Sequence, residues 1–305
     1  MQGSAGPRGR TMSIRTHLRA LEALRPGRML ALSASRLDID LLPPLYEALR
    51  ALGPAERLNV LVQCRGGEAN AARRIALLLH AFARRLTLLV PHRCESAGTV
   101  LALAAHEIVA GPRAVFSPIG PHFGPHFGPR FRGEDVDAGP APMSSEDFRE
   151  CWRRRCDGFG PARSEAREKA LQRLCDGVFP TTLTAVHRST RELERIGGEL
   201  LSLPLGARPR ATRAEIVSTL LYGFDSPTCA LSADDLRRIG LPVVRDPALE
   251  GPAWDAGCAL RRLADPESRR DEDDLWHDAV IATAESAQRR LHRREAPAGR
   301  WEPLP

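Results

Sequence analysis

A serine at the junction between two predicted elements is the clearest candidate for chemistry in this sequence. Residues 94–98 read Cys-Glu-Ser-Ala-Gly and lie between a strand-like run at 86–90 and a helix-like run at 97–105. The dipole of a helix stabilises a developing alkoxide at its first residue, and the next backbone amide can face an oxyanion. The alternative is a plain N-cap serine, which does no chemistry. The pattern makes Ser96 a candidate nucleophile for acyl transfer.

A pair of glycines occupies a similar junction earlier in the chain. Residues 64–68 read Cys-Arg-Gly-Gly-Glu, between a strand-like run at 58–62 and a helix-like run at 69–84. Glycines have no Cβ, so the backbone amides can approach a ligand closely. We interpret Gly66 and Gly67 as part of an oxyanion hole. An ordinary tight turn between strand and helix is the alternative.

The predicted elements around these two segments alternate between strand and helix. Short apolar runs predict the strands, and apolar residues at helical spacing predict the helices. The predicted strands are 29–33, 58–62, 86–90, 108–110 and 241–244, and the predicted helices include 45–52, 69–84, 97–105, 182–201 and one that Ser232 caps and Gly240 ends. Because parallel strands need crossover connections, this alternation predicts an α/β fold with a mainly parallel sheet.

The chain divides into three predicted parts. Residues 1–27 are expected to be a loose arm with brief helical character at 14–24, and residues 28–245 form the main domain. That domain includes a Gly/Pro-rich loop at 117–142, in which Gly-Pro-His-Phe occurs twice in tandem, and a helical part at 144–222. Residues 246–305 are expected to be a C-terminal helical elaboration, with a helix at 274–293.

Several segments, taken in order, resemble one family of serine peptidases. Residues 61–67, 72–75, 88–91, 96–111 and 117–121 look like the core of the serine dehydrogenase proteinase family, which is related to Clp protease and signal peptide peptidase A. Residues 232–244 resemble the segment with which these proteins return to the core. The resemblance covers residues 28–245 and implies a Clp/crotonase-like fold.

The resemblance also implies roles for matched positions. Ser96 would be the nucleophile, the amides of Gly67 and Ala97 would bind the oxyanion, and Gly66 would shape the turn. It further implies a peptide or protein substrate, a homo-oligomer, and no metal or cofactor.

Departures from the family pattern keep two alternatives open. Gly120 stands where the family usually has Asp, and Cys64-Arg65 replaces its Thr/Ser-Pro. The chain is therefore alternatively a catalytically degenerate Clp-fold protein used for binding or assembly. Residues 102–118 also resemble the crotonase core, so a crotonase-like acyl-CoA enzyme is a second alternative, and such an enzyme needs no Ser96.

The general base is open between two residues. A serine needs an adjacent proton acceptor. His122 follows Ser96 by a spacing similar to that of serine and histidine in Clp proteases, and His126 duplicates it. Signal peptide peptidases use lysine instead, and Lys169 is the only lysine here. Each candidate also has an interpretation without catalysis. His122 and His126 would be loop histidines, and Lys169 would be a solvated residue on a helix.

Composition excludes several classes of protein. The net charge is +6, but arginines alternate with acids and aromatics are only 5% of the chain, so we expect no specific nucleic-acid binding. The seven cysteines include no CxxC pair, which argues against a disulfide framework and a metal site and favours the cytoplasm. No apolar run is long enough to predict a transmembrane helix, and peripheral membrane association stays open.

Overall fold

The computed structural model describes residues 12–120, 122–123, 143–144, 180–264, 274–294 and 299–304. Its centre is a sheet in which consecutive strands run parallel. These strands are, in spatial order, β1 (Arg28–Ala34), β2 (Ala55–Cys64), β3 (Ala83–Val90), β5 (Glu107–Ala110) and β9 (Val243–Val244). The predicted α/β fold, with mainly parallel strands and crossover helices, is confirmed.

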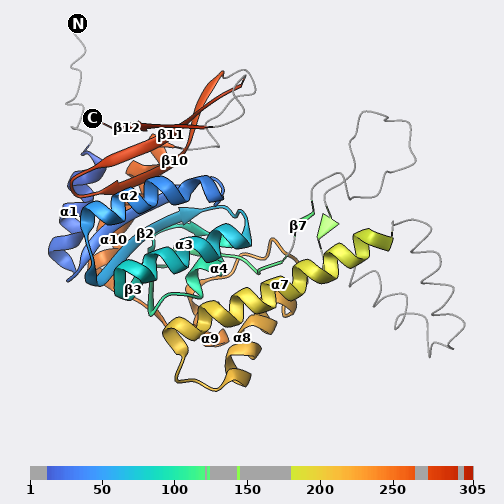
Figure 1. Ribbon diagram of the computed structural model, residues 1–305. Coiled ribbons are helices and arrows are strands. Elements are labelled where there is room, and N and C mark those ends of the chain that lie inside the picture. Colours follow the sequence, from blue (N-terminus) through green and yellow to red (C-terminus); the bar gives the residue numbers. More distant parts are fainter. Residues whose placement is uncertain are drawn as a thin grey trace, which may run out of the picture.

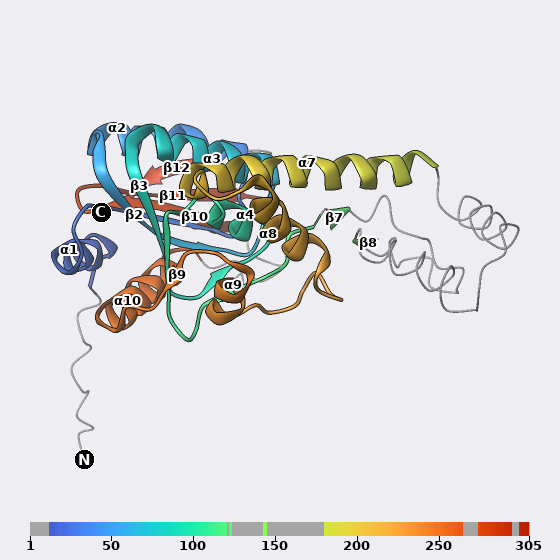
Figure 2. The ribbon, with the colours of Figure 1, turned by 90° about the horizontal axis from the view of Figure 1, so that it is seen from below.

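Helices cover both faces of this sheet, as Figures 1 and 2 show. One face carries α2 (Leu42–Leu52), which follows a short 3-10 turn at Ile39–Leu41, together with α3 (Ala69–Phe82) and α4 (Ala97–Ala102). The long α7 (Pro180–Leu205) and then α8 (Arg210–Tyr222) pack outside them. The other face carries α1 (Ile14–Leu24) and α10 (Pro247–Leu263).

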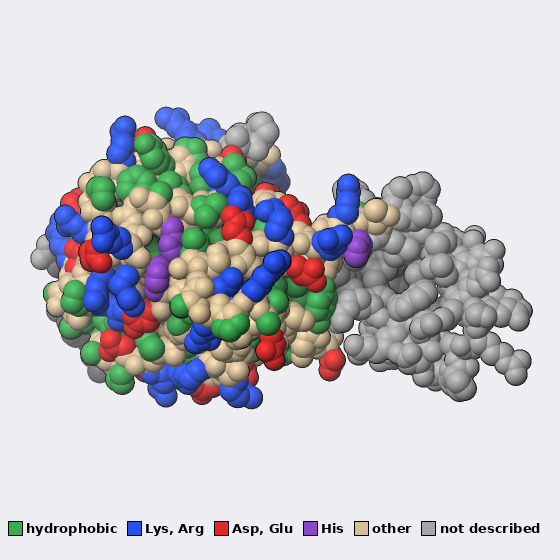
Figure 3. Space-filling model, turned by 60° about the horizontal axis from the view of Figure 1, so that its bottom comes forward, with side chains coloured by type: hydrophobic (Ala, Val, Ile, Leu, Met, Phe, Trp, Pro, Cys, Tyr) green, Lys and Arg blue, Asp and Glu red, His purple; other side chains and the backbone are tan. Residues whose placement is uncertain are grey.

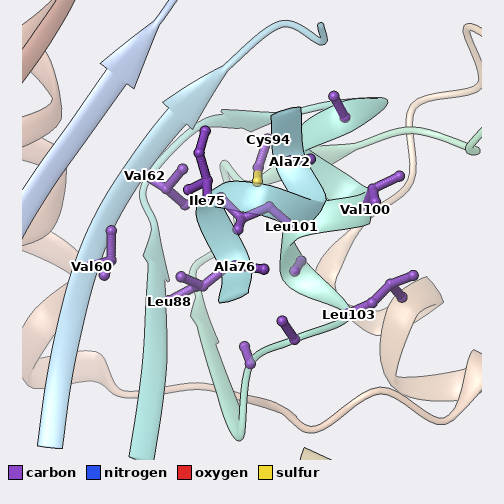
Figure 4. Close-up of a cluster of buried hydrophobic side chains, with 14 of the residues drawn as sticks. Val60, Val62, Ala72, Ile75, Ala76, Leu88, Cys94, Val100, Leu101 and Leu103 are labelled. Carbon is purple, nitrogen blue, oxygen red and sulfur yellow. The ribbon is translucent and has the colours of Figure 1, made fainter. Parts of the chain in front are cut away.

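Burial on both faces explains why the central strands are almost continuously apolar. In β2, Val60 and Val62 belong to the apolar cluster under α2 and α3, whereas Leu61 belongs to the cluster under α1 and α10. Parallel strands covered on both sides have this composition. Figure 4 shows Val62 of β2 beside Ile75 of α3, with Leu101 of α4 next to Ile75 and Val60 further along the strand. All four belong to one buried cluster, so the sheet, α3 and α4 share one core.

The N-terminal helix is part of the core, so the expectation of a loose arm is wrong for residues 14–24. Ile14, Leu18 and Leu21 are buried, and they lie on one face of α1 because their spacing follows the helical period. The side chain of Ser13 caps the helix by accepting a hydrogen bond from the amide of Thr16. α1 packs against α10, its neighbour in Figure 2. The apolar face therefore has a partner that lies more than 200 residues away in the chain.

The predicted helix at 274–293 is also wrong, because these residues form strands. β10 (Leu275–Thr283) runs antiparallel to β1, β11 (Ala287–Arg293) runs antiparallel to β10, and β12 (Arg300–Pro303) completes the edge. The amide of Thr283 donates to the carbonyl of Ser286 and closes the turn between β10 and β11. The edge of β1 offers unpaired backbone groups to these residues, and the sequence of residues 274–293 alone gives no sign of that distant partner.

Buried ion pairs tie this C-terminal extension to the first loop. The guanidinium of Arg290 forms bidentate hydrogen bonds, each 2.8 Å long, with Asp278 on β10 and with Asp38 before α2. Arg290 is only 3% exposed, so its charge needs both carboxylates. Together these bonds keep the pKa of the guanidinium raised in spite of its burial.

The last parallel strand is positioned by a short capped helix. α9 (Ala233–Ile239) begins at a capping box in which Ser232 accepts from the amide of Asp235 and the carboxylate of Asp235 accepts from Ser232. These bonds from Ser232 lower the pKa of Asp235. The helix ends at Gly240, whose φ of +108° is left-handed. Both ends agree with the sequence prediction.

Four two-residue strands complete the described structure: β4 (Arg93–Cys94), β6 (Val115–Phe116), β7 (His122–Phe123) and β8 (Met143–Ser144). β4 pairs with β2 and β6, and β7 pairs with β8. Most of the predicted loop at 117–142 and the first part of the predicted helical region lie outside the described residues. Within the described part of the chain, no helix is long and apolar enough to cross a bilayer.

Candidate functional site

Ser96 has an unusual backbone conformation. It lies between β4 and α4 with φ of 51° and ψ of −107°, and it is the only non-glycine residue with positive φ in the described ranges. Such a conformation costs about 1–3 kcal/mol and persists only where the surroundings enforce it. The Ser96 side chain makes no capping hydrogen bond to the helix. Ser96 is therefore the N-cap residue of α4 by position, but its hydroxyl does not cap the helix.

A buried pair of hydroxyls holds this conformation. The backbone N–H of Ser96 donates to Oγ of Ser117 at 2.8 Å, and that hydroxyl donates in turn to the carbonyl of Pro118. Thr99 lies beneath, with its Oγ1 within 3.1 Å of the Cys94 carbonyl and 2.9 Å of the Ser117 carbonyl. Both hydroxyl-bearing residues are buried. Ser117 thus fixes the turn through a bond to the backbone of the candidate nucleophile.

Ser117 and Thr99 lie within the family-like segments, but the sequence does not predict a role for either residue. The only signal was local: two small polar residues among apolar neighbours, one in α4 and one after β6. Their function depends on the contact between these two segments, which the sequence does not display.

The glycine turn is fixed by a neighbouring segment. Gly66 and Gly67 have φ of +139° and +137°, values that favour glycine. The amide of Leu37 donates to the Gly66 carbonyl at 2.8 Å, and the amide of Glu68 donates to the Leu37 carbonyl at 2.8 Å. A Cβ on Gly67 would overlap the backbone of Leu37. The turn therefore requires glycine at position 67 for close backbone contact as well as for φ.

Gly66 faces the candidate nucleophile. A Cβ built on Gly66 would lie 3.4 Å from Cβ and 3.8 Å from Oγ of Ser96. Gly66, Gly67, Ser96 and Ala97 all line one cavity of about 530 Å³. No described residue accepts a hydrogen bond from the amides of Gly67 and Ala97. The structure brings all the predicted nucleophile and oxyanion residues to one place.

The outer wall of this cavity comes from α7. Ser189, Glu192 and Leu193 line it, opposite the start of α3. Asn70 Nδ2 donates to Glu192 Oε1 at 3.0 Å, which links α3 to α7 at the cavity. The remaining charged lining residues are Arg36, Arg65 and Glu68, so the cavity has both signs of charge.

A bidentate ion pair fastens α7 to α3 beside the cavity. Nε and Nη2 of Arg73 donate to the two carboxylate oxygens of Glu199 at 2.7 and 2.6 Å. These hydrogen bonds lower the pKa of Glu199 and raise that of Arg73. Planar bidentate pairs of this kind are geometrically specific. The pair sets the distance between the cavity's two walls.

The candidate bases stay undecided. His122 lies on β7, where its backbone pairs with Ser144, and its side chain is outside the described part of the structure. His126 and Lys169 are outside the described residues. Among the described residues that line the cavity there is no histidine or lysine. The assignment of the base to His122 or Lys169 remains a prediction.

His106, which ends the segment after Ser96, lies elsewhere. Its Nδ1 accepts from the amide of Leu86 at 3.1 Å, and its ring is 5.4 Å from that of His80. Burial lowers the pKa of His106, with smaller contributions from His80 and Arg85. The residue therefore lies in a packed site at the start of the strands and takes no part in the cavity.

Two cysteines form the floor under the serine turn. Cys64 and Cys94 are partners across β2 and β4 and are both buried. A Cβ on Gly98 would overlap the sulfur of Cys64, so the helix approaches the thiols closely. The contact with Cys64, followed by burial, raises the pKa of the Cys94 thiol. These thiols act as small buried groups, and no cluster of metal-ligating side chains occurs among the described residues.

A family model matches the part of the chain that builds this site. Residues 36–130 match the model described as ClpP-like SDH-type serine proteinase. The matched range includes Gly66, Gly67, Ser96 and Ser117. The resemblance predicted from the motifs is therefore confirmed over these residues.

Comparisons with individual proteins are more limited. Two uncharacterized proteins of Methanocaldococcus jannaschii are 32% and 34% identical over 77 residues, which is 25% of this chain. The match spans only 26% and 27% of their own lengths. Two structures of a membrane-bound stomatin-specific protease, one with its serine and one with its lysine replaced by alanine, are 12% identical. The match to the serine variant covers 70% of this chain and 77% of the protease chain, with a TM-score of 0.41. The match to the lysine variant, which is a complex with a substrate peptide, covers 70% of this chain and 73% of the protease chain, with a TM-score of 0.40.

Proposed function

We propose that this chain, whose residues 36–130 match ClpP-like SDH-type serine proteinases, is a serine peptidase with Ser96 as its nucleophile. One observation carries the proposal: Ser96 has a positive φ, its amide is held by Ser117, and its hydroxyl lies beside Gly66 without a hydrogen bond to any described residue. Strain of this kind clusters at active sites because it preorganises a reacting group.

The reaction we propose is acyl transfer followed by hydrolysis. Oγ of Ser96 attacks the carbonyl carbon of a peptide bond, and its proton passes to the base, either His122 or Lys169. The C–N bond then breaks, the proton goes to the leaving amine, and an ester to Ser96 remains. Water, deprotonated by the same base, hydrolyses the ester and returns the proton to Ser96.

The amides of Gly67 and Ala97 are the proposed oxyanion hole. They line the same cavity as Ser96, and no described residue accepts from either. Donors that are fixed before reaction stabilise the negative oxygen without reorganisation. The rigid contact of Gly67 with Leu37 supplies such fixation.

Other features of the proposal rest on the family resemblance. From it we propose a peptide or protein substrate and a homo-oligomer. The cytoplasmic setting that we also propose rests instead on the seven cysteines, which include no CxxC pair. Figure 3 supports the expectation that nucleic acid is not a specific partner, because basic and acidic side chains are interspersed on the face it presents.

Labelling with a fluorophosphonate, measured by intact mass, tests the nucleophile directly. The wild type should gain one adduct, and Ser96→Ala should gain none. Ser218→Ala is the control, because Ser218 is an exposed serine on α8 and should label like the wild type. An adduct on Ser96→Ala would refute the assignment. A wild type that never labels would favour the degenerate binding protein or the crotonase-like enzyme, neither of which needs a reactive serine.

A further inference from the structure

A second cavity lies on the opposite face of the sheet from Ser96. It has a volume of about 220 Å³ and is bounded by the ends of β1 and β2, by the segment at β4 and by the last turn of α10. The polar side chains that line it include Ser33, Gln63, Arg65, His92, Arg93 and Arg261. Ligands of open α/β sheets bind outside the carboxyl ends of parallel strands, which is where this cavity lies.

The lining of this cavity is strongly cationic. Three guanidinium groups contribute to it, from Arg65, Arg93 and Arg261, and no aspartate or glutamate does so among the described residues. Arg93 also donates a hydrogen bond to the carboxylate of Glu95 at 3.3 Å, and Glu95 does not line the cavity. An arginine stays charged at any ordinary pH, so Arg261 brings to the cavity a positive charge that no carboxylate in the described lining neutralises.

Arg261 is the clearest case. Its Nη1 donates to Nδ1 of His92 at 2.9 Å, its Nη2 lies 3.0 Å from Sγ of Cys258, and its guanidinium covers the ring of Trp254 at 4.7 Å. Each of these groups orients the guanidinium, but none is a carboxylate. A half-buried cation held in place by neutral groups is arranged to receive an anion.

Polar residues also replace apolar ones on the strands where they reach the cavity. On this face of the sheet, Met29 and Ala31 of β1 and Leu61 of β2 belong to the apolar core, whereas the next inward positions are Ser33 and Gln63. Gln63 is 6% exposed, and no described residue accepts from its amide nitrogen. A buried donor without an acceptor costs about 1–3 kcal/mol, so these polar residues weaken the core unless they serve a ligand.

We propose that this cavity binds a small oxyanion through Arg261, Arg93 and Gln63. Its volume corresponds to about seven water molecules at about 30 Å³ each, which suits a phosphate group or a short dicarboxylate but not a peptide. Arginine forks match both phosphate and carboxylate oxygens. The site does not depend on catalysis at Ser96, and it adds a binding function to the face that the proposed peptidase site does not use.

Isothermal titration calorimetry with inorganic phosphate and with succinate, at constant ionic strength made up with sodium chloride, tests the proposal. The wild type should bind at least one of them saturably with one site per chain, and the better of the two identifies the preferred oxyanion. Arg261→Gln should weaken binding roughly tenfold to hundredfold, as expected for a lost charged hydrogen bond. Arg262→Gln removes the same charge from the adjacent exposed residue of α10 and should leave binding unchanged.

A second variant guards against a folding defect in Arg261→Gln. Gln63→Met keeps the side-chain length but removes the donor, so it should weaken binding while raising the melting temperature of the ligand-free protein. Absence of saturable binding of both anions to the wild type would overturn the proposal. An equal loss of affinity in Arg261→Gln and Arg262→Gln would also overturn it, because it would indicate general attraction to a basic protein.

Discussion

Removing the hydroxyl of Ser117 should expose how much of the reactivity of Ser96 depends on its enforced backbone. Ser117→Ala leaves the amide of Ser96 without the acceptor that now lies 2.8 Å away, in a place from which the buried Ser117 excludes water. An unsatisfied buried amide costs about 1–3 kcal/mol. The strain at Ser96, also about 1–3 kcal/mol, would then favour relaxation of the turn.

The expected effect on chemistry follows from these values. Each 1.4 kcal/mol withdrawn from the reactive geometry slows reaction about tenfold, so fluorophosphonate labelling of Ser117→Ala should be roughly five- to hundredfold slower than that of the wild type. The assay is the rate of adduct formation by intact mass, beside urea unfolding of the same samples.

A variant destabilised at a site away from Ser96 shows whether slower labelling comes from a general loss of stability or from a misplaced Ser96. Ile281 is buried in β10, far from Ser96 in the sheet order, and Ile281→Val should cost about 1 kcal/mol. Its labelling rate should equal that of the wild type. If Ser117→Ala is destabilised yet labels at the wild-type rate, Ser117 has only a structural role and our account of the turn is wrong.

Two further predictions concern stability. Because glycine adopts positive φ without strain, Ser96→Gly should be about 1–2 kcal/mol more stable than Ser96→Ala in urea unfolding, and equal stability would show that the turn is not strained. Arg73→Gln should lose no more than about 1 kcal/mol at pH 7, since the pair is partly exposed. Because the pKa of Glu199 is lowered, the stability that the pair contributes is fully present above the ordinary glutamate pKa of about 4.3 and is lost as pH falls through the lowered pKa. The unfolding free energies of Arg73→Gln and the wild type should therefore begin to converge only when the pH falls below the ordinary glutamate pKa. Arg74→Gln, on the exposed face of α3, should show no such convergence, and a constant gap between Arg73→Gln and the wild type down to acid pH would contradict the assignment.

The two cavities use opposite faces of one sheet end. The first lies between α3, α4 and α7 and holds Ser96, whereas the second lies beneath α10 and is lined by cations. Arg65 lines both, because it begins the turn that leads from β2 into the glycine pair. The carboxyl ends of parallel strands give both cavities backbone groups and loops close to a rigid sheet.

The local sequence pattern predicts the parallel core and the position of Ser96 within it. Apolar runs and helical spacing depend on neighbours a few residues apart, so β1, β2, β3 and β5 and the helices between them were predictable. The order of a parallel sheet then brings the ends of β2 and β4 together, which places the glycine turn beside the serine.

Features that depend on partners far away in the chain could not be predicted from the local sequence. The segment at 275–293 reads as charged and helical by itself and becomes strand because the edge of β1, more than 240 residues earlier, offers unpaired backbone groups. The helix at 14–24 becomes core because α10 covers it. The positive φ of Ser96 exists because Ser117 accepts from its amide. Such contacts overrule local propensity because their free energy comes from groups that the local sequence does not contain.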